Sequence, residues 1–392
     1  MKIFKSLPFR LLIALAIGIA TGLIVNETAM QIVVTLQHLS GAVIMFLVPL
    51  IIIGFIAPSI TKLGGNASKL LGIALGLAYV SSIGAAFFST AAGYGIIPHL
   101  TVAGNADVTR ELPKAIFDLQ IPQIMPVMSA LVFSVLIGLA AVWNKSQRII
   151  ATLDEFQEIV ISIVVKVIIP ILPFFIACTF CSLTYEGGVT HQLPLFLVVI
   201  LLVVVGHFIW LVLLYGVAAA YSGKNSLRVL KHYLPAYLTA VGTMSSAATL
   251  PVALSCARKS DVLRPDMVSF GIPLFANIHL CGSVLTETFF VMTVSLALYG
   301  VLPPVGAMIL FCLLLGVFAI GAPGVPGGTV MASLGLITGI LGFDEAGTAL
   351  MLTIFALQDS FGTACNVTGD GALTLILSRY TENGERPRQQ LK

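Results

Sequence analysis

The sequence predicts an all-α polytopic membrane protein with eight transmembrane helices and two re-entrant helical hairpins. Two observations predict the class: of the 392 residues, 58% are hydrophobic and only 9% are charged, and the mean hydropathy is +1.04. Soluble domains average about 25% charged residues, so this chain has too few polar residues to cover a soluble surface. A third observation, the placement of basic residues, sets the number of spans. The net charge of +3 is small and gives no indication of nucleic-acid binding.

The first 25 residues begin with basic residues and continue into an apolar stretch, as a signal peptide does. The stretch lacks a clear small-x-small cleavage site followed by a polar mature sequence, and another apolar stretch follows shortly. We therefore expect residues 11–25 to remain as the first transmembrane helix. We expect the protein in the inner membrane of a bacterium.

A transmembrane helix needs about 20 apolar residues. Candidate spans follow one another along the first part of the chain: 11–25, 32–56, 70–97, 121–142, 159–183 and 195–221. The last part contains two more long candidates, 268–298 and 346–378. An apolar segment interrupted by Gly, Pro and hydroxyl residues precedes each of these, at 233–258 and 303–341.

Basic residues gather in cytoplasmic loops, and this rule orients the chain. With the N-terminus inside, most basic loop residues face the cytoplasm: Lys62, Lys69, Lys145, Arg148, Lys224, Arg228, Lys231, Arg379, Arg386, Arg388 and Lys392. Arg110 and Lys114 fall outside, and Lys166 lies within a span. This orientation places both termini in the cytoplasm.

This assignment of basic loops to the cytoplasm holds only if the two interrupted segments do not cross the membrane. Segment 233–258 has basic residues beyond both of its ends, whereas the loops around 303–341 are poor in Lys and Arg. We therefore expect two re-entrant hairpins that enter from opposite faces. The alternative is two ordinary spans with Gly-rich kinks. Non-helical backbone at membrane depth needs cover from protein or a water-filled cavity, and interrupted segments of this kind indicate a transporter's binding site.

Asp359, Thr363, Asn366 and Asp370 interrupt the last apolar stretch at the spacing i, i+4, i+7 and i+11, which aligns them on one helix face. A charge in hydrocarbon costs at least about 2.5 kcal/mol. No basic residue lies nearby in the sequence, and Lys166 cannot pair with several acids at once. We expect the missing positive charge to come from a ligand, namely an amine, a metal cation or a proton. The alternative is a protonated Asp in a structural hydrogen-bond network.

The interrupted segments carry complementary chemistry. The first contains Ser245 and Ser246 in a hydroxyl-rich stretch that suits a carboxylate, and the second contains a Gly- and Pro-rich stretch that exposes backbone groups. Between them, His279, Ser283 and Glu287 recur every four residues. A buried Glu on the same segment favours a proton-handling role for His279, although a packing role is the common one for a membrane His.

The six cysteines all lie in apolar segments, and the C-x-x-C formed by Cys178 and Cys181 has no second pair or His cluster beside it. We expect small core residues there rather than a metal or redox site.

Three motifs resemble those of the dicarboxylate/amino acid:cation symporters, the family of archaeal aspartate transporters and mammalian glutamate transporters. SSAATLP at 245–251 resembles the first hairpin, GVPGG at 324–328 the tip of the second, and NVTGD at 366–370 the last helix. The resemblance implies the elevator fold of the glutamate-transporter homologues and a homotrimer. It also implies a transport part, approximately 66–114 and 191–380, that slides against a scaffold part, approximately 1–65 and 115–190.

The resemblance further implies roles for individual residues. Asp359 is expected to hold the substrate's amino group, and Asp370 with Asn366 to bind sodium. The substrate's α-carboxylate is expected to contact Thr363, Asn366, Ser245, Ser246 and the hairpin backbone at Val325, Pro326 and Gly327. Hairpin two is expected to act as the gate.

Two departures from the family pattern modify this reading. Members that carry acidic substrates have an arginine at the position of Gly362 or of Met244, and this chain has neither. A second carboxylate would then lie unbalanced near Asp359 and Asp370, so we predict a neutral amino acid substrate, with Gly362 leaving room for its side chain. A dicarboxylate or another small carboxylate is the alternative.

The second departure concerns the coupling ion. The family motif Asn-Met-Asp-Gly-Thr becomes His279-Leu-Cys281-Gly-Ser283 in this chain. Sodium prefers oxygen ligands, so the loss of Asn and Asp weakens its sites. We expect a reduced sodium stoichiometry, or proton coupling through His279 or Glu287.

The expected function is therefore secondary active symport with sodium or protons as transported coupling ions, without a cofactor. A substrate-gated channel or a transport-inactive receptor is the alternative from another class. A membrane enzyme built on Ser245, Ser246 and His279 is disfavoured, because no water-facing acidic partner is evident in the sequence.

Overall fold

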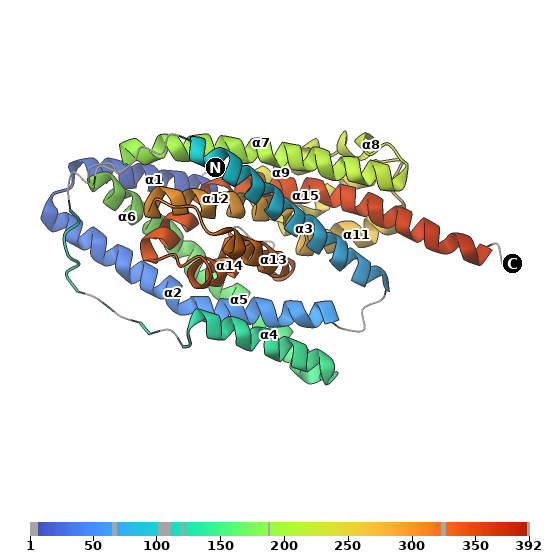
Figure 1. Ribbon diagram of the computed structural model, residues 1–392, viewed down its shortest axis with the longest axis horizontal. Helices are drawn as coiled ribbons and strands as arrows, with labels where there is room; N and C mark the ends of the chain where they lie inside the picture. The colour runs from blue at the N-terminus through green and yellow to red at the C-terminus, as the bar shows by residue number, and fades with distance from the viewer. Residues whose placement is uncertain are drawn as a thin grey trace.

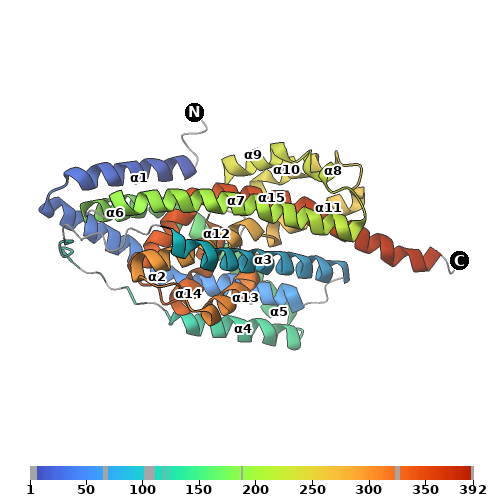
Figure 2. The same ribbon diagram turned by 45° about the horizontal axis from the view of Figure 1, so that its top comes forward.

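The structure is a computed structural model that describes residues 7–64, 69–100, 111–117, 119, 121–122, 124–186, 189–322 and 327–389. Across these ranges the regular secondary structure is helical, without strands. Most helices run along the long axis of the molecule (Figures 1 and 2). The predicted all-helical class is confirmed.

The N-terminal half contributes seven α-helices and two short irregular helices. In chain order they are α1 (Leu7–Ile24), α2 (Glu27–Gly64), α3 (Lys69–Ile96), the 3-10 helix η2 (Ile97–His99), α4 (Val127–Trp143), α5 (Gln147–Ile163), the π-helix η3 (Val164–Ile168), α6 (Ile169–Tyr185) and α7 (Val189–Ser222). The C-terminal half follows with α8 (Leu227–Leu230), α9 (Leu234–Thr243), α10 (Ser246–Ala257), α11 (Pro265–Ile278), α12 (Cys281–Tyr299), α13 (Val305–Gly321), α14 (Gly328–Gly339) and α15 (Glu345–Gln389).

Three helical segments of the described chain are long and apolar enough to cross a membrane on their own: Leu70–His99, Leu195–Ser222 and Pro265–Tyr299. A bent pair, Gln147–Ile168 with Pro173–Ser182, adds a fourth if it is one span. These lengths support a polytopic protein, whereas the number of eight spans stays a prediction.

The helices pack in two groups. In the first group α1 lies against α6, and α2 lies against α4, α5 and α6. In the second group α12 lies between α3, α7 and α15, while α9, α10 and α11 pack against α15. The two groups meet where α13 and α14 lie on α2 and α14 also reaches α4. The division into a scaffold part and a transport part, and a sliding motion between them, stay predictions.

Both interrupted segments fold as pairs of helices that pack on each other. Helices α9 and α10 are connected by Met244 and Ser245. Helices α13 and α14 are connected by the segment 322–327, and they also pack against each other. Met244 adopts a left-handed conformation with φ of 52°, and Gly327 ends the second connection with φ of 71°. Their depth in a membrane stays a prediction, since it follows from the charge placement alone.

The sequence predicted one span over 268–298. In the structure this stretch consists of two helices, α11 and α12. The backbone of His279 is extended, with φ of −118° and ψ of 106°, so that α11 ends before it and α12 begins at Cys281. The first N–H groups of α12 and the last C=O groups of α11 therefore need partners from elsewhere. This break lies at the centre of the candidate site.

Two glycines of α1 allow its close contact with α6. A Cβ added at Gly18 would lie 2.4 Å from the carbonyl oxygen of Ala177, and one at Gly22 would lie 2.6 Å from that of Cys181. Small residues four apart let membrane helices approach closely, and this pair follows that pattern.

The C-terminal end of α15, beyond the apolar stretch, forms an ion pair with the residue that follows the end of α7 by two positions. Lys224 Nζ donates to Glu382 Oε1 at 2.7 Å. The hydrogen bond from Lys224 and the nearby Arg379 hold the pKa of Glu382 below its usual range. The pair is partly exposed, so its net contribution is small.

We expect Gly18→Val to lower the free energy of unfolding by about 1–3 kcal/mol, because the added side chain overlaps the α6 backbone. Thermal unfolding of the purified protein measures this. Gly76→Val is the matched control, since a Cβ at Gly76 on α3 meets nothing within 4 Å. Equal midpoints for the two variants would contradict the assigned contact between α1 and α6.

Candidate functional site

The polar residues of α15 are buried inside the molecule. Asp359, Thr363, Asn366 and Asp370 are each at most 4% exposed. Asn366 and Asp370 face the break between α11 and α12, while Asp359 faces the beginning of α14. The structure therefore joins this helix face to both the break and hairpin two.

Asp359 is bound to the tip of hairpin two. Its Oδ2 accepts a hydrogen bond of 2.7 Å from the backbone N–H of Gly327. Gly327 immediately precedes the N-terminus of α14. N–H groups at a helix N-terminus have no partner within the helix, so this one is available to the carboxylate. The expected site residues Val325 and Pro326 lie outside the described residues.

A second carboxylate holds α14 from the other side. Glu287 on α12 accepts a hydrogen bond at Oε1 from the hydroxyl of Ser333 on α14. Its other oxygen, Oε2, is buried and has no hydrogen-bond partner among the described residues. Asp359 and Glu287 thus anchor the second helix of hairpin two at two points, and the sequence analysis missed Ser333.

Asn366 satisfies the beginning of α12. Its Oδ1 accepts from the N–H groups of Gly282 at 2.7 Å and Ser283 at 3.2 Å, and its Nδ2 donates to Ser283 Oγ at 2.9 Å. These N–H groups have no partner within their own helix. One hydrogen of the Asn366 amide remains for a further acceptor.

His279 lies in the break and bridges two helices. Its Nδ1 is 2.9 Å from Asp370 Oδ1, and its Nε2 is 2.9 Å from Ser81 Oγ on α3. A carboxylate accepts hydrogen bonds, so Nδ1 donates to Asp370. Asp370 Oδ2 is buried and has no hydrogen-bond partner in the described part of the chain. The expected face of His279, Ser283 and Glu287 is thus interrupted, because the backbone at 279 is not helical.

Close packing brings α12 and α15 together at the motif. A Cβ added at Gly282 would lie 2.4 Å from the carbonyl oxygen of Gly362. A Cβ added at Gly362 would in turn lie 3.2 Å from Ser283 Cα. Gly362 therefore serves helix contact, and space for a ligand side chain beside it stays a prediction. Cys281 is fully buried at the first position of α12.

His207 is a site residue that the sequence analysis missed. From α7 its Nε2 contacts the carbonyl oxygen of Gly282 at 3.0 Å and Thr286 Oγ1 at 2.9 Å. It thus contacts the carbonyl group of Gly282, the residue whose N–H donates to Asn366. A lone His inside a long apolar stretch gave no spacing signal that could identify it.

Hairpin one contributes the other polar surface. Ser245 precedes α10, and its hydroxyl accepts from the N–H of Ala248 at 3.2 Å, as an N-cap does. Ser246 and Met244 are both buried, and α9 and α10 pack against α15. The hairpin is thus adjacent to the helix that carries Asp359, although the role of its serines stays a prediction.

The electrostatics of the site are one-sided. Asp359, Asp370 and Glu287 are buried, and no Lys or Arg is buried among the residues whose side chains the structure describes. Lys166 is exposed and shares a shallow groove with Glu155 and Glu158 on the surface of α5. Likewise, the described side chains form no group of three or more His, Cys, Asp or Glu suited to hold a metal ion.

We expect Asn366→Leu to strand the N–H groups of Gly282 and Ser283, at about 1–3 kcal/mol of unfolding free energy for each donor. Thermal unfolding measures the loss. Asn277→Leu is the control, because the amide of Asn277 is exposed and bonds only within α11. A loss no larger than that of the control would contradict the capping role.

Comparison with known proteins gives a consistent family. The model of the sodium:dicarboxylate symporter family matches residues 7–380. A putative sodium-dependent excitatory amino acid transporter, glt-4, of Caenorhabditis elegans is 29% identical over 218 residues, which cover 54% of this chain and 42% of that protein. Excitatory amino acid transporter 2 of Mus musculus is 27% identical over 254 residues, covering 63% and 43%.

A bacterial relative matches over its full extent. The proton/sodium-glutamate symport protein of Bacillus caldotenax is 26% identical over 420 residues, covering 98% of this chain and 97% of that protein. The chain spans less than half the length of the two animal relatives and nearly all of the bacterial one.

Proposed function

Because the chain belongs to the sodium:dicarboxylate symporter family, a family of transporters and not of enzymes, we propose that it is a secondary active symporter. It imports a small neutral amino acid together with a cation. One observation carries the proposal: three carboxylates are buried beside a helix break and a hairpin, and no buried Lys or Arg of the described chain neutralises them. A transported cation or ammonium group supplies the missing charge.

The substrate's ammonium group binds Asp359. That carboxylate accepts the N–H of Gly327 at Oδ2, and an ammonium group offers it a charged donor. The α-carboxylate is held by Thr363, the free amide hydrogen of Asn366 and the hydroxyls of Ser245 and Ser246. Backbone at 325–327 completes the site, as the family resemblance implies.

The substrate's side chain is neutral in this proposal. Positions 362 and 244, where acidic-substrate members carry an arginine, are Gly and Met, and both are buried. A second carboxylate would enter a region that already holds Asp359 and Asp370. A dicarboxylate or another small carboxylate is the second candidate, because the Bacillus caldotenax relative is named a glutamate symport protein.

Concentrative uptake of labelled neutral amino acids into proteoliposomes tests the proposal. We expect Asp359→Asn to reduce uptake at least 30-fold, since the loss of a buried charge partner costs about 2–5 kcal/mol. Asp261→Asn, at an exposed ion pair with Arg228, is the control and should transport normally.

Two outcomes would contradict this assignment. Uptake that is inhibited by aspartate or glutamate, and not by neutral amino acids, would favour the second candidate. Binding without concentrative uptake under any gradient would favour the substrate-gated channel or the transport-inactive receptor.

The coupling ion follows from the His279 contacts. His279 engages one oxygen of Asp370, a residue that the family resemblance assigns to sodium, and it also engages Ser81. Cys281 offers sulfur where an oxygen ligand would suit sodium. We therefore place fewer sodium ions in the transport cycle than the family resemblance implies, with protons carried through His279 or Glu287.

Uptake driven by an inward proton gradient should persist without sodium in the wild type. We expect His279→Asn to reduce this proton-driven uptake at least tenfold and to increase the dependence on sodium, because an amide oxygen replaces the imidazole beside Asp370. His232→Asn, outside the apolar stretches, is the control. Loss of proton-driven uptake in Glu287→Gln alone would assign the proton to Glu287. Uptake abolished without sodium in the wild type would refute proton coupling.

We infer an elevator mechanism, in which the second helix group moves along the first. Hairpin two lies on α2, and Gln157 of α5 donates to the carbonyl oxygen of Gly321 at 3.1 Å. The outer face of hairpin one is uncovered within this chain, with Leu234 and Leu238 exposed by 64% and 60%. We propose that this arrangement is one end state of the cycle. Assembly as a homotrimer in the inner membrane, with both termini in the cytoplasm, completes the proposal.

A further inference from the structure

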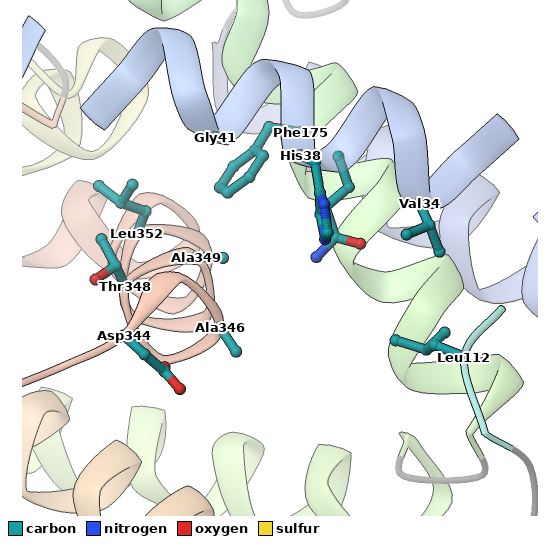
Figure 3. A pocket seen from close by; sticks show the side chains of 11 residues that line it. Val34, His38, Gly41, Leu112, Phe175, Asp344, Ala346, Thr348, Ala349 and Leu352 are labelled. Atoms are coloured by element: carbon teal, nitrogen blue, oxygen red, sulfur yellow. The ribbon is translucent and has the colours of Figure 1, made fainter. Parts of the chain in front are cut away.

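A cavity of about 390 Å³ lies between the two helix groups, at the beginning of α15 (Figure 3). It is bounded by α2, α6 and the beginning of α15. Its lining consists of Val34, Gln37, His38, Gly41, Leu112, Phe175, Asp344, Ala346, Thr348, Ala349 and Leu352. Leu352 precedes Asp359 by seven residues, about two helical turns, so the cavity and the candidate substrate site occupy different levels of α15.

One wall of the cavity is apolar and aromatic. Phe175 of α6 presents its ring to the same space as Ala349 of α15 (Figure 3). Gly41 of α2 keeps this space open, since an added Cβ would lie 3.6 Å from Phe175 Cε2 and a longer side chain would extend beside the ring. The wall suits a flat apolar body.

The opposite rim is polar and acidic. The Tyr299 hydroxyl and the Gly347 N–H both donate to Asp344 Oδ1, each at 2.8 Å. Oδ2 is therefore available to a ligand. His38 adds ring nitrogens from α2, and Figure 3 shows them directed toward the space between α2 and α15. No Lys or Arg lines the cavity among the described residues.

Thr348 provides a second, independent observation. It is 3% exposed, and its Oγ1 has no hydrogen-bond partner among the described residues. Thr353 and Thr374 on the same helix instead donate to the carbonyl group four residues earlier. A buried hydroxyl without a partner is costly, so a ligand group beside it would recover a hydrogen bond.

We propose that this cavity is a binding site for a small amphipathic amine, distinct from the transported substrate. The ammonium group pairs with Asp344 Oδ2 and reaches His38, and the apolar body lies against Phe175 and Leu352. The volume lies in the range of small-molecule sites, and a cation near an aromatic ring adds attraction. An acid finds no Lys or Arg among the described lining residues and meets the carboxylate of Asp344, so the site discriminates against carboxylates.

The site has a consequence for transport that rests on the proposed function. A ligand in the cavity contacts α2 and α6 of the first group and α15 of the second at once. It therefore opposes sliding of one group along the other and inhibits uptake without competing with the substrate. Binding itself does not depend on transport, so a failure of the transport proposal leaves the site testable.

The test uses the purified full chain in lipid nanodiscs, with 2-phenylethylamine as probe and calorimetry as readout. We expect Asp344→Asn and Gly41→Leu each to weaken binding at least tenfold, because one removes the charge and the other fills the space. Asn at 344 retains an acceptor for Tyr299 and Gly347. The matched controls are Asp261→Asn, at an exposed acid, and Gly72→Leu on α3, where an added Cβ meets nothing within 4 Å. Neither control should change binding.

Three results would overturn the proposal. Wild-type affinity in both cavity variants would place the probe elsewhere. Loss of binding in Asp359→Asn, with Gly41→Leu unaffected, would place the probe in the substrate site. Equal affinity for 2-phenylethanol, which lacks the ammonium group, would show an apolar cavity that lipid or detergent fills, and not an amine site.

Discussion

The rest of the structure depends on how three carboxylates are held inside an apolar chain. Asp359, Glu287 and Asp370 each receive a hydrogen bond from a different element: the tip of hairpin two, the hydroxyl of Ser333 and the imidazole of His279. Each bond joins segments that are far apart in the sequence. Because a buried carboxylate without a partner is costly, these bonds also fix where α12, α14 and α15 lie relative to one another.

The helix break between α11 and α12 depends on the same set of contacts. Asn366 binds the N–H groups at the beginning of α12, while His207 contacts the Gly282 carbonyl from α7. His279, in the break, reaches both Asp370 and Ser81. A shift of α15 near Asp359 therefore also changes the contacts that Asn366 and Asp370, on the same helix, make with the break. In the proposed function, the substrate contact at Asp359 and the cation contact at Asn366 lie seven residues apart on α15, so coupling between substrate and cation needs no longer path.

The sequence predicted the features that follow from local pattern. Period-3.6 spacing aligned the polar residues of α15, and Gly, Pro and hydroxyl residues located the two helical pairs around 244 and 325. Contacts between residues far apart in the sequence could not be predicted from local pattern. His279 and Asp370 are 91 residues apart, and Glu287 and Ser333 are 46 residues apart. Ser81, His207 and Ser333 are single polar residues without a spacing signal. The break at His279 was also missed, since no Gly or Pro occupies 279 or 280 and the bonds that stabilise it come from α3, α7 and α15.

Asp359 connects recognition to the position of hairpin two. Its Oδ2 accepts from the N–H of Gly327, the residue immediately before α14, while Glu287 accepts from Ser333 further along that helix. In the proposed function, a substrate ammonium group at Asp359 either shares the carboxylate with Gly327 or displaces it. In both cases the energy of the hairpin tip changes on binding, whereas the anchor at Ser333 remains. If the carboxylate is shared, Asp359 holds the amine and the tip together. If the amine displaces Gly327, whatever stabilises the tip against Asp359 weakens amine binding, and the amine favours release of the tip, because linkage of this kind is reciprocal.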